Sequence, residues 1–191
     1  MYDYYGVYAA CRDAAWRCHL DFNMRRLPIK LLYLTRLAGI RVICDSKVKE
    51  LRQGEVGASI YVNGRWSIVY DDRMPICESR MVLAHELGHI LLGHEYKYSD
   101  YRFFAENKKL KSEREADMFA IRLLAPACVL HELGALDTKT IAELCEIPEK
   151  AAQDRAKRMQ ILEKRSRFYQ SELEKRVYEN FREFIENSRQ K

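Results

Sequence analysis

The chain has 191 residues and a formal net charge of +5 at pH 7, with 48% hydrophobic and 32% charged residues. This length suits one domain with a small appendage and can bury a core, while the charge is too small to argue for nucleic-acid binding. No apolar run is long enough to span a bilayer, and the first residues do not resemble a signal peptide. Six scattered cysteines without a C-x-x-C pair are typical of reduced thiols, so we expect a cytoplasmic protein without membrane contact.

The first part of the chain is predicted to combine helices with short strands. An aromatic and alanine-rich stretch from residue 4 to about residue 23 predicts a helix, and Pro28 opens a second helix that ends at Gly39. Residues 40–45 are typical of a strand, and residues 58–71 predict a β-hairpin with Asn63-Gly64 as a type I′ turn. We therefore expect an α+β fold, in which a small antiparallel sheet packs on the helix that follows.

That next helix carries the most informative motif, H-E-x-x-H, formed by His85, Glu86 and His89 within the apolar residues 81–92. Because residues four apart lie on one face of a helix, both imidazoles point at one spot, where a single metal ion can bind them. Glu86 would then lie beside a metal-bound water as the general base. A core helix with two buried histidines is the alternative, and the cost of burying unpaired polar groups disfavours it.

Two other residues of this helix need an explanation. His94 does not match the spacing of the third histidine in H-E-x-x-H-x-x-G-x-x-H proteins. At about 100° per residue it lies across the helix from His85, so we interpret it as a helix-terminating residue after Gly93 and not as a ligand. Gly88 lowers the stability of a helix by about 1 kcal/mol relative to alanine. The close approach of another backbone, from the sheet or the substrate, would compensate for this cost; the alternative is that the glycine is simply tolerated.

The third ligand is expected from the acidic start of the next helix, predicted over residues 112–124. Glu113 and Asp117 are four residues apart and share the face that is predicted to be buried, whereas Glu115 faces elsewhere and fits a capping box with Ser112. Glu113 is therefore the predicted third ligand, and Asp117 the predicted hydrogen-bond acceptor for a ligand histidine. The alternative is that all three acids only favour a helix N-terminus.

The remaining segments are predicted to be mostly helical. Residues 95–111 could form a flap over the cleft, although we favour a solvated loop. Residues 138–158 resemble a helix-turn-helix, but acids in the second helix suit DNA poorly, so direct DNA binding is not expected and packing or partner docking is the alternative. An apolar stripe between residues 149 and 191 predicts a long amphipathic helix, which could fold back on the domain or form an oligomer.

These residues predict metal-assisted peptide hydrolysis. His85, His89 and Glu113 would hold one divalent ion per chain, with zinc expected and another ion possible. The ion would lower the pKa of a bound water and polarise the scissile carbonyl, and Glu86 would pass the proton to the leaving amine. Nothing in the sequence chooses among the candidate donors to the oxyanion, which are Tyr96, Tyr98, Tyr101 and His131.

The motif and the downstream acids together resemble the ImmA/IrrE metallopeptidases, bacterial and mobile-element enzymes of the gluzincin type. The segments that carry this resemblance are Ala84–His89, Glu113–Ala120, Leu123–Pro126 and, upstream, Leu27–Leu32 and Ala38–Val42. The resemblance covers about residues 20–158, and the family often has Asn at the position of Asp117. It implies a zinc metallo-endopeptidase whose substrate is a helix-turn-helix transcriptional repressor of a mobile element or stress regulon, held extended along the sheet edge.

An alternative of a different class is a metal-containing binding protein that regulates a repressor by capture without cleavage. Glu86 argues against capture, which needs no general base, and a DNA-binding regulator would rest on the helix-turn-helix pattern alone. The predicted division of the chain is a minimal gluzincin-like metallopeptidase domain (1–133), a helix-turn-helix-like helical segment (134–160) and a C-terminal amphipathic helix (161–191).

Overall fold

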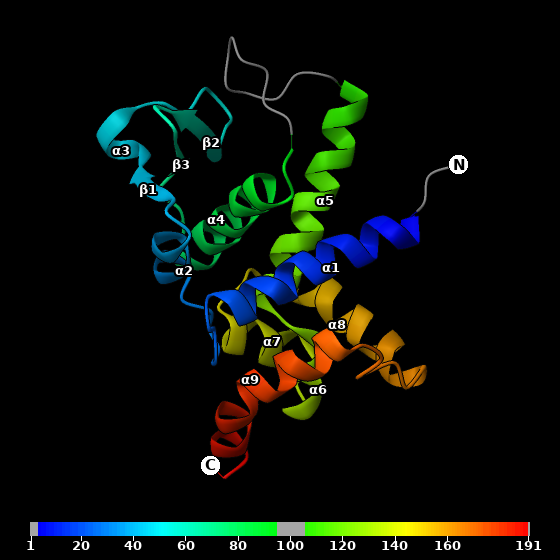
Figure 1. Ribbon diagram of the computed structural model, residues 1–191. Coiled ribbons are helices and arrows are strands. Elements are labelled where there is room, and N and C mark those ends of the chain that lie inside the picture. Colours follow the sequence, from blue (N-terminus) through cyan, green and yellow to red (C-terminus); the bar gives the residue numbers. More distant parts are fainter. Residues whose placement is uncertain (1–3, 95–105, 191) are drawn as a thin grey trace.

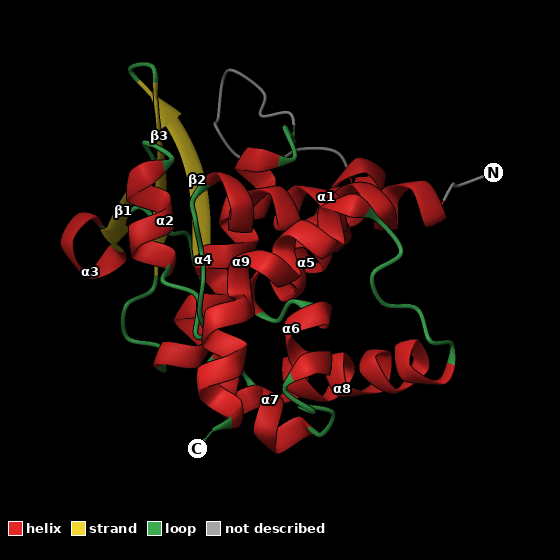
Figure 2. Ribbon diagram, turned by 60° about the horizontal axis from the view of Figure 1, so that its bottom comes forward, coloured by secondary structure: helices red, strands yellow, loops and turns green. Residues whose placement is uncertain are grey.

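The computed structural model describes residues 4–94 and 106–190, which are mostly helical, with one small sheet at one side of the molecule (Figures 1 and 2). In chain order the elements are α1 (Tyr4–Asp21), α2 (Leu31–Leu37), β1 (Arg41–Cys44), α3 (Asp45–Val48), β2 (Gly57–Val62), β3 (Arg65–Tyr70), α4 (Ile76–Leu91), α5 (Glu106–Leu124), α6 (Ala127–Glu132), α7 (Thr138–Cys145), α8 (Glu149–Lys164) and α9 (Glu172–Arg189). The predicted α+β class is confirmed. None of the helices in these ranges has the length and apolar character needed to cross a membrane.

The sheet has the strand order β1-β3-β2 and is mixed. β2 and β3 form the predicted antiparallel hairpin, and Asn63 and Gly64 have the positive φ values, 51° and 75°, that a type I′ turn requires. The prediction of a wholly antiparallel sheet is wrong, because β1 pairs with β3 in parallel. β3 is the central strand, and its Ile68 and Val69 are the most completely buried residues of the sheet.

The helix α4 lies between the sheet and the rest of the helices. It packs against β2 and β3 on one side and against α5 on another, and α1 lies across α5 (Figure 1). Leu83, Ala84 and Leu87 of α4 belong to the hydrophobic core, which continues through α5 and α6 to α9. The apolar run around the motif therefore holds α4 in place from several sides.

Two helix starts differ from the prediction. α2 begins at Leu31 and not at Pro28. α5 begins at Glu106, so Ser112 and Glu115 lie inside the helix and the predicted capping box between them is wrong. The polar residues before Ser112 extend the helix because lysine and glutamate are good helix formers. Of the predicted loop or flap, residues 106–111 are helical and residues 95–105 lie outside the described part of the chain.

The segment that resembles a helix-turn-helix contains two helices, α7 and α8, with Glu146 in the left-handed conformation between them (φ 51°). The single helix predicted from residue 149 onward is instead divided, because the chain leaves the helical conformation at Ser166 and Tyr169. Ser171 then caps α9 by accepting a hydrogen bond from the backbone N–H of Glu174 (3.2 Å). The C-terminal amphipathic helix itself is confirmed as α9, which folds back onto α1 and α6.

The six cysteines are free thiols. Cys11 and Cys18 are buried, as predicted for small hydrophobic residues of α1.

Candidate metal centre

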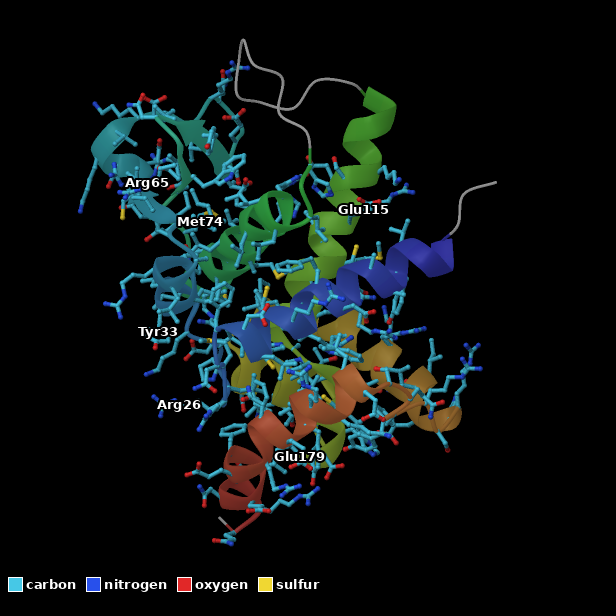
Figure 3. All side chains as sticks on the ribbon, in the orientation of Figure 1. Arg26, Tyr33, Arg65, Met74, Glu115 and Glu179 are labelled. Atoms are coloured by element: carbon cyan, nitrogen blue, oxygen red, sulfur yellow. The ribbon has the colours of Figure 1, made fainter. Side chains whose placement is uncertain are left out.

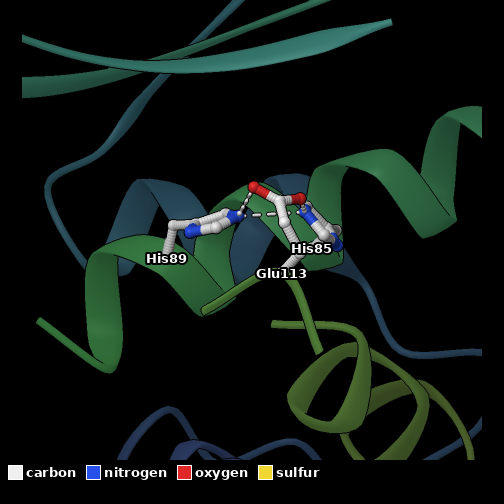
Figure 4. Close-up of side chains that lie close together, drawn as sticks. All are labelled: His85, His89 and Glu113. Carbon is white, nitrogen blue, oxygen red and sulfur yellow. Dashed lines mark hydrogen bonds and ion pairs between the residues drawn. The ribbon is translucent and has the colours of Figure 1, made fainter. Parts of the chain in front are cut away.

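Three donor groups from α4 and α5 converge on one point (Figure 4). His85 Nε2 lies 3.0 Å from His89 Nε2 and 3.1 Å from Glu113 Oε2, and His89 Nε2 lies 3.7 Å from Glu113 Oε1. Zinc bonds of about 2.0–2.1 Å at tetrahedral angles separate neighbouring donor atoms by roughly 3.3 Å. The three predicted ligand residues thus lie together with the spacing that one small ion needs.

Asp117 lies beside the first of these histidines, as predicted. Its Oδ1 is 2.8 Å from His85 Nδ1. The prediction that Asp117 is buried is wrong, because its side chain is 65% exposed at the edge of the contact between α4 and α5. Since a carboxylate only accepts hydrogen bonds, His85 Nδ1 is the donor, so a neutral His85 has its lone pair on Nε2, facing Glu113 and His89.

His89 is oriented by two residues for which the sequence predicted other roles. His94 Nδ1 lies 2.9 Å from His89 Nδ1, and His94 Nε2 lies 3.1 Å from Glu115 Oε2. Gly93, with a φ of 66°, turns the chain after α4, and Glu115 comes from α5 (Figure 3). If the carboxylate of Glu115 accepts from His94 Nε2, then His94 Nδ1 accepts from His89 Nδ1, which leaves the lone pair of His89 on Nε2.

The donor set therefore fits a cation. Two imidazole lone pairs and one carboxylate face one another, and such groups repel unless positive charge lies between them. A proton on Nε2 can supply this positive charge in place of an ion: burial lowers the pKa of His85, but the hydrogen bonds of the protonated ring to Asp117 and Glu113 outweigh this effect and raise the pKa to about 10. The hydrogen bond with His85 and the nearby ring of His89 hold the pKa of Glu113 well below its usual range. Both shifts reflect the same preference of the site for positive charge.

Glu86 is held from the side of the sheet. Its Oε2 accepts a hydrogen bond from the buried Ser59 hydroxyl of β2 at 2.7 Å. A Cβ added to Gly57 would lie 3.2 Å from Glu86 Oε1 and would overlap with the Val82 side chain, so β2 approaches α4 closely at this glycine. No pattern in the sequence marks Ser59, because its role arises only when the hairpin packs on α4.

Gly88 allows α4 and α5 to approach each other. A Cβ at this position would lie 3.2 Å from both Cα and O of Ala116 and 3.0 Å from Phe119 Cδ1. The predicted close approach of another backbone is confirmed, but that backbone belongs to a helix and not to the sheet. Ala116 lies between Glu113 and Asp117, so the contact at Gly88 brings both acids next to the histidines.

Of the four candidate oxyanion donors, three lie outside the described residues and one lies away from the metal centre. Tyr96, Tyr98 and Tyr101 are outside the described residues. His131 is on α6, where its ring stacks on Phe168 with centroids 3.9 Å apart and its Nδ1 pairs with Glu163. His131 therefore belongs to the packing of α6 against α8 and the segment that follows it.

Residues 38–157 match the model of a peptidase family described as the IrrE N-terminal-like domain. The match covers more than half of the chain, so the protein belongs to this family, in agreement with the ImmA/IrrE resemblance of its motifs. The matched region contains the sheet, α4, α5 and the pair α7 and α8 up to residue 157, whereas α1, α2 and α9 lie outside it. No curated protein matches the chain significantly.

Proposed function

We propose that the protein is a zinc-dependent endopeptidase that hydrolyses a peptide bond within a protein substrate. The observation that carries this proposal is the convergence of His85 Nε2, His89 Nε2 and the Glu113 carboxylate, with Glu86 adjacent, in a chain that belongs to a peptidase family. Three protein ligands are typical of catalytic zinc sites, which keep a fourth position for water or substrate, whereas structural sites use four.

The chain's own residues suit the steps of hydrolysis. Zinc bound by these ligands would supply an acidic water and polarise the substrate carbonyl. The Ser59 hydroxyl holds Oε2 of Glu86, so Oε1 is the oxygen that takes a proton from the nucleophile and delivers it to the leaving amine. Asp117 and the pair His94–Glu115 keep the ligand imidazoles in orientation through the ring nitrogens that face away from Glu113.

The sheet offers a place for an extended substrate. β2 is a terminal strand of the sheet, pairs with β3 on one side and packs against α4 beside Glu86. An extended peptide can add to such an edge through main-chain hydrogen bonds. We propose that the substrate binds along β2 and that, as the family resemblance implies, it is a helix-turn-helix transcriptional repressor in the cytoplasm.

The Glu86→Gln variant tests the hydrolytic role. The amide is nearly isosteric but cannot accept the proton, so we expect this variant to keep its fold and metal while losing cleavage of a candidate repressor. The matched control is Glu78→Gln, which removes the same charge in the first turn of α4 and should cleave like the wild type. Unchanged cleavage by Glu86→Gln would contradict the mechanism. Repressor binding without cleavage by the wild-type protein would instead favour capture.

The ligand set has a separate test. Metal content after dialysis, measured by mass spectrometry, should be about one zinc ion per wild-type chain and close to none in His85→Ala and Glu113→Ala. Full occupancy in Glu113→Ala, with loss in Glu115→Ala, would mean that Glu115 is the third ligand. Loss of metal in Glu86→Gln would identify Glu86 as a ligand.

A further inference from the structure

A second polar site lies in a pocket of about 300 Å³ between α1, the end of α5, α8 and the segment that joins α8 to α9. In Figure 1, α1 crosses α5, and α8 lies next to the end of α5 where they cross. Six of the lining residues are arginines: Arg12, Arg122, Arg155, Arg158, Arg165 and Arg167. None of the metal-centre residues lines this pocket, so its charge has no part in the proposed peptidase chemistry.

Two of these arginines are buried without a carboxylate partner among the described residues. Arg155 is 4% exposed, and its guanidinium donates to the backbone carbonyl of Ala125 (2.8 Å from Nε). Arg122 is 6% exposed and donates from Nη1 to the carbonyl of Met118 (2.6 Å), while its buried Nε has no hydrogen-bond partner among the residues that the structure describes. Buried guanidinium groups without counter-charge are costly, and the free donor on Arg122 indicates that an acceptor is missing.

The acidic residue that lines the pocket does not provide this acceptor. Glu174 Oε2 accepts a hydrogen bond from the backbone N–H of Gln170 (3.0 Å), as part of the cap at the start of α9. Burial raises the pKa of Glu174 and so favours its neutral form. The carboxylate of Asp13 is paired with Arg12 at 2.8 Å, so within the described part of the chain no carboxylate pairs with Arg122 or Arg155.

The surroundings of Tyr8 show that the electrostatic potential in the pocket is positive. Cζ of Arg122 and Cζ of Arg158 lie 4.0 Å and 4.9 Å from its ring centroid, and Arg158 Nε donates to its hydroxyl oxygen at 3.1 Å. Burial raises the pKa of Tyr8, but the charges of the surrounding arginines outweigh this effect and lower it. An environment that stabilises a phenolate also stabilises other anions.

We infer that this pocket binds a small phosphate-bearing molecule, with a phosphate group among Arg122, Arg155 and Arg158. Guanidinium groups bind phosphate oxygens through paired, charge-assisted hydrogen bonds, and the volume matches the lower range of small-molecule sites. A nucleic-acid backbone fits less well, because it would reach the exposed Arg165 and Arg167 at the rim but not the buried Arg122 and Arg155.

Calorimetric titration with inorganic phosphate, pyrophosphate and adenosine monophosphate, at constant ionic strength, tests this site. The His85→Ala chain is used throughout, so that phosphate binding to a metal ion does not contribute. We expect saturable binding of one anion per chain, weakened roughly tenfold or more by Arg158→Gln, which removes charge-assisted hydrogen bonds. The matched control is Arg17→Gln, an exposed arginine of α1 outside the pocket, which should bind like the parent chain.

A buried variant, Arg122→Gln, extends the test, and thermal unfolding shows whether the variant is folded. Loss of binding in folded Arg122→Gln supports the site. Three results would overturn it: no saturation at millimolar phosphate, equal weakening by Arg158→Gln and Arg17→Gln, or binding of duplex DNA through Arg165 and Arg167 without any binding of the small anions.

Discussion

Replacing Gly88 with alanine would show whether the contact between α4 and α5 determines metal affinity. The added Cβ would lie 3.2 Å from two backbone atoms of Ala116 and 3.0 Å from the Phe119 ring. A side chain can change rotamer to relieve such contacts, but the backbone of Ala116 cannot. We therefore expect α5 to move away from α4 by a few tenths of an ångström.

The expected energies follow from two opposing effects. Overpacking in a close-packed interior costs about 1–3 kcal/mol, while alanine in place of glycine stabilises a helix by about 1 kcal/mol. The net loss in the free energy of unfolding is therefore about 0–2 kcal/mol. Metal binding is more sensitive, because Glu113 moves with α5 and ligand distances are tolerated within about 0.2 Å. We expect zinc affinity to fall about tenfold, which corresponds to about 1.4 kcal/mol.

Competition with a chromophoric chelator would measure zinc affinity, and urea unfolding of the metal-free chains would measure stability. Gly57→Ala provides a matched control, because its added Cβ meets Val82 and Glu86 and does not meet a proposed ligand. This control should lower cleavage by displacing Glu86 while zinc affinity stays close to that of the wild type.

Wild-type zinc affinity together with increased stability in Gly88→Ala would refute this reasoning, because the helix preference for alanine would then have prevailed without any movement of Glu113. An equal loss of affinity in Gly88→Ala and Gly57→Ala would also contradict it, since the effect would not be specific to the contact between α4 and α5.

Substitutions at three further positions test the groups around the site. Asp117→Ala should weaken zinc binding roughly 10–100-fold without unfolding the chain, and Asp117→Asn, which keeps an acceptor oxygen, should lose less zinc affinity. Chelator competition measures both affinities. Wild-type zinc affinity in Asp117→Ala would contradict the role of Asp117 in orienting His85. Glu115→Ala should weaken zinc binding less than Asp117→Ala does, because Glu115 contacts His94 and reaches the proposed ligand His89 only through it, whereas Asp117 contacts His85 directly. A larger loss of zinc affinity in Glu115→Ala than in Asp117→Ala would contradict this reasoning. Ser59→Ala should lower kcat while zinc affinity is unchanged, since only the hydrogen bond to Glu86 is removed; an unchanged kcat would contradict this role.

Local periodicity in the sequence was sufficient to predict the central part of the site. His85, Glu86 and His89 are neighbours on one helix, so their relative positions depend on helix geometry and little else. The turn at Asn63 and Gly64 is equally local, because it depends on residues that tolerate positive φ. The spacing of Glu113 and Asp117 predicted that both could serve the histidines, and the structure places both beside His85.

The tertiary structure decided the features that depend on contacts between separate elements. The parallel pairing of β1, the contact of Ser59 with Glu86 and the chain from His89 through His94 to Glu115 join residues whose distance no local pattern specifies. The pocket that contains Arg122 and Arg155 is of the same kind, because it forms only where α1, α5 and α8 meet. Helix and strand periods determine which side chains share a face, whereas packing of the hydrophobic core determines which faces meet.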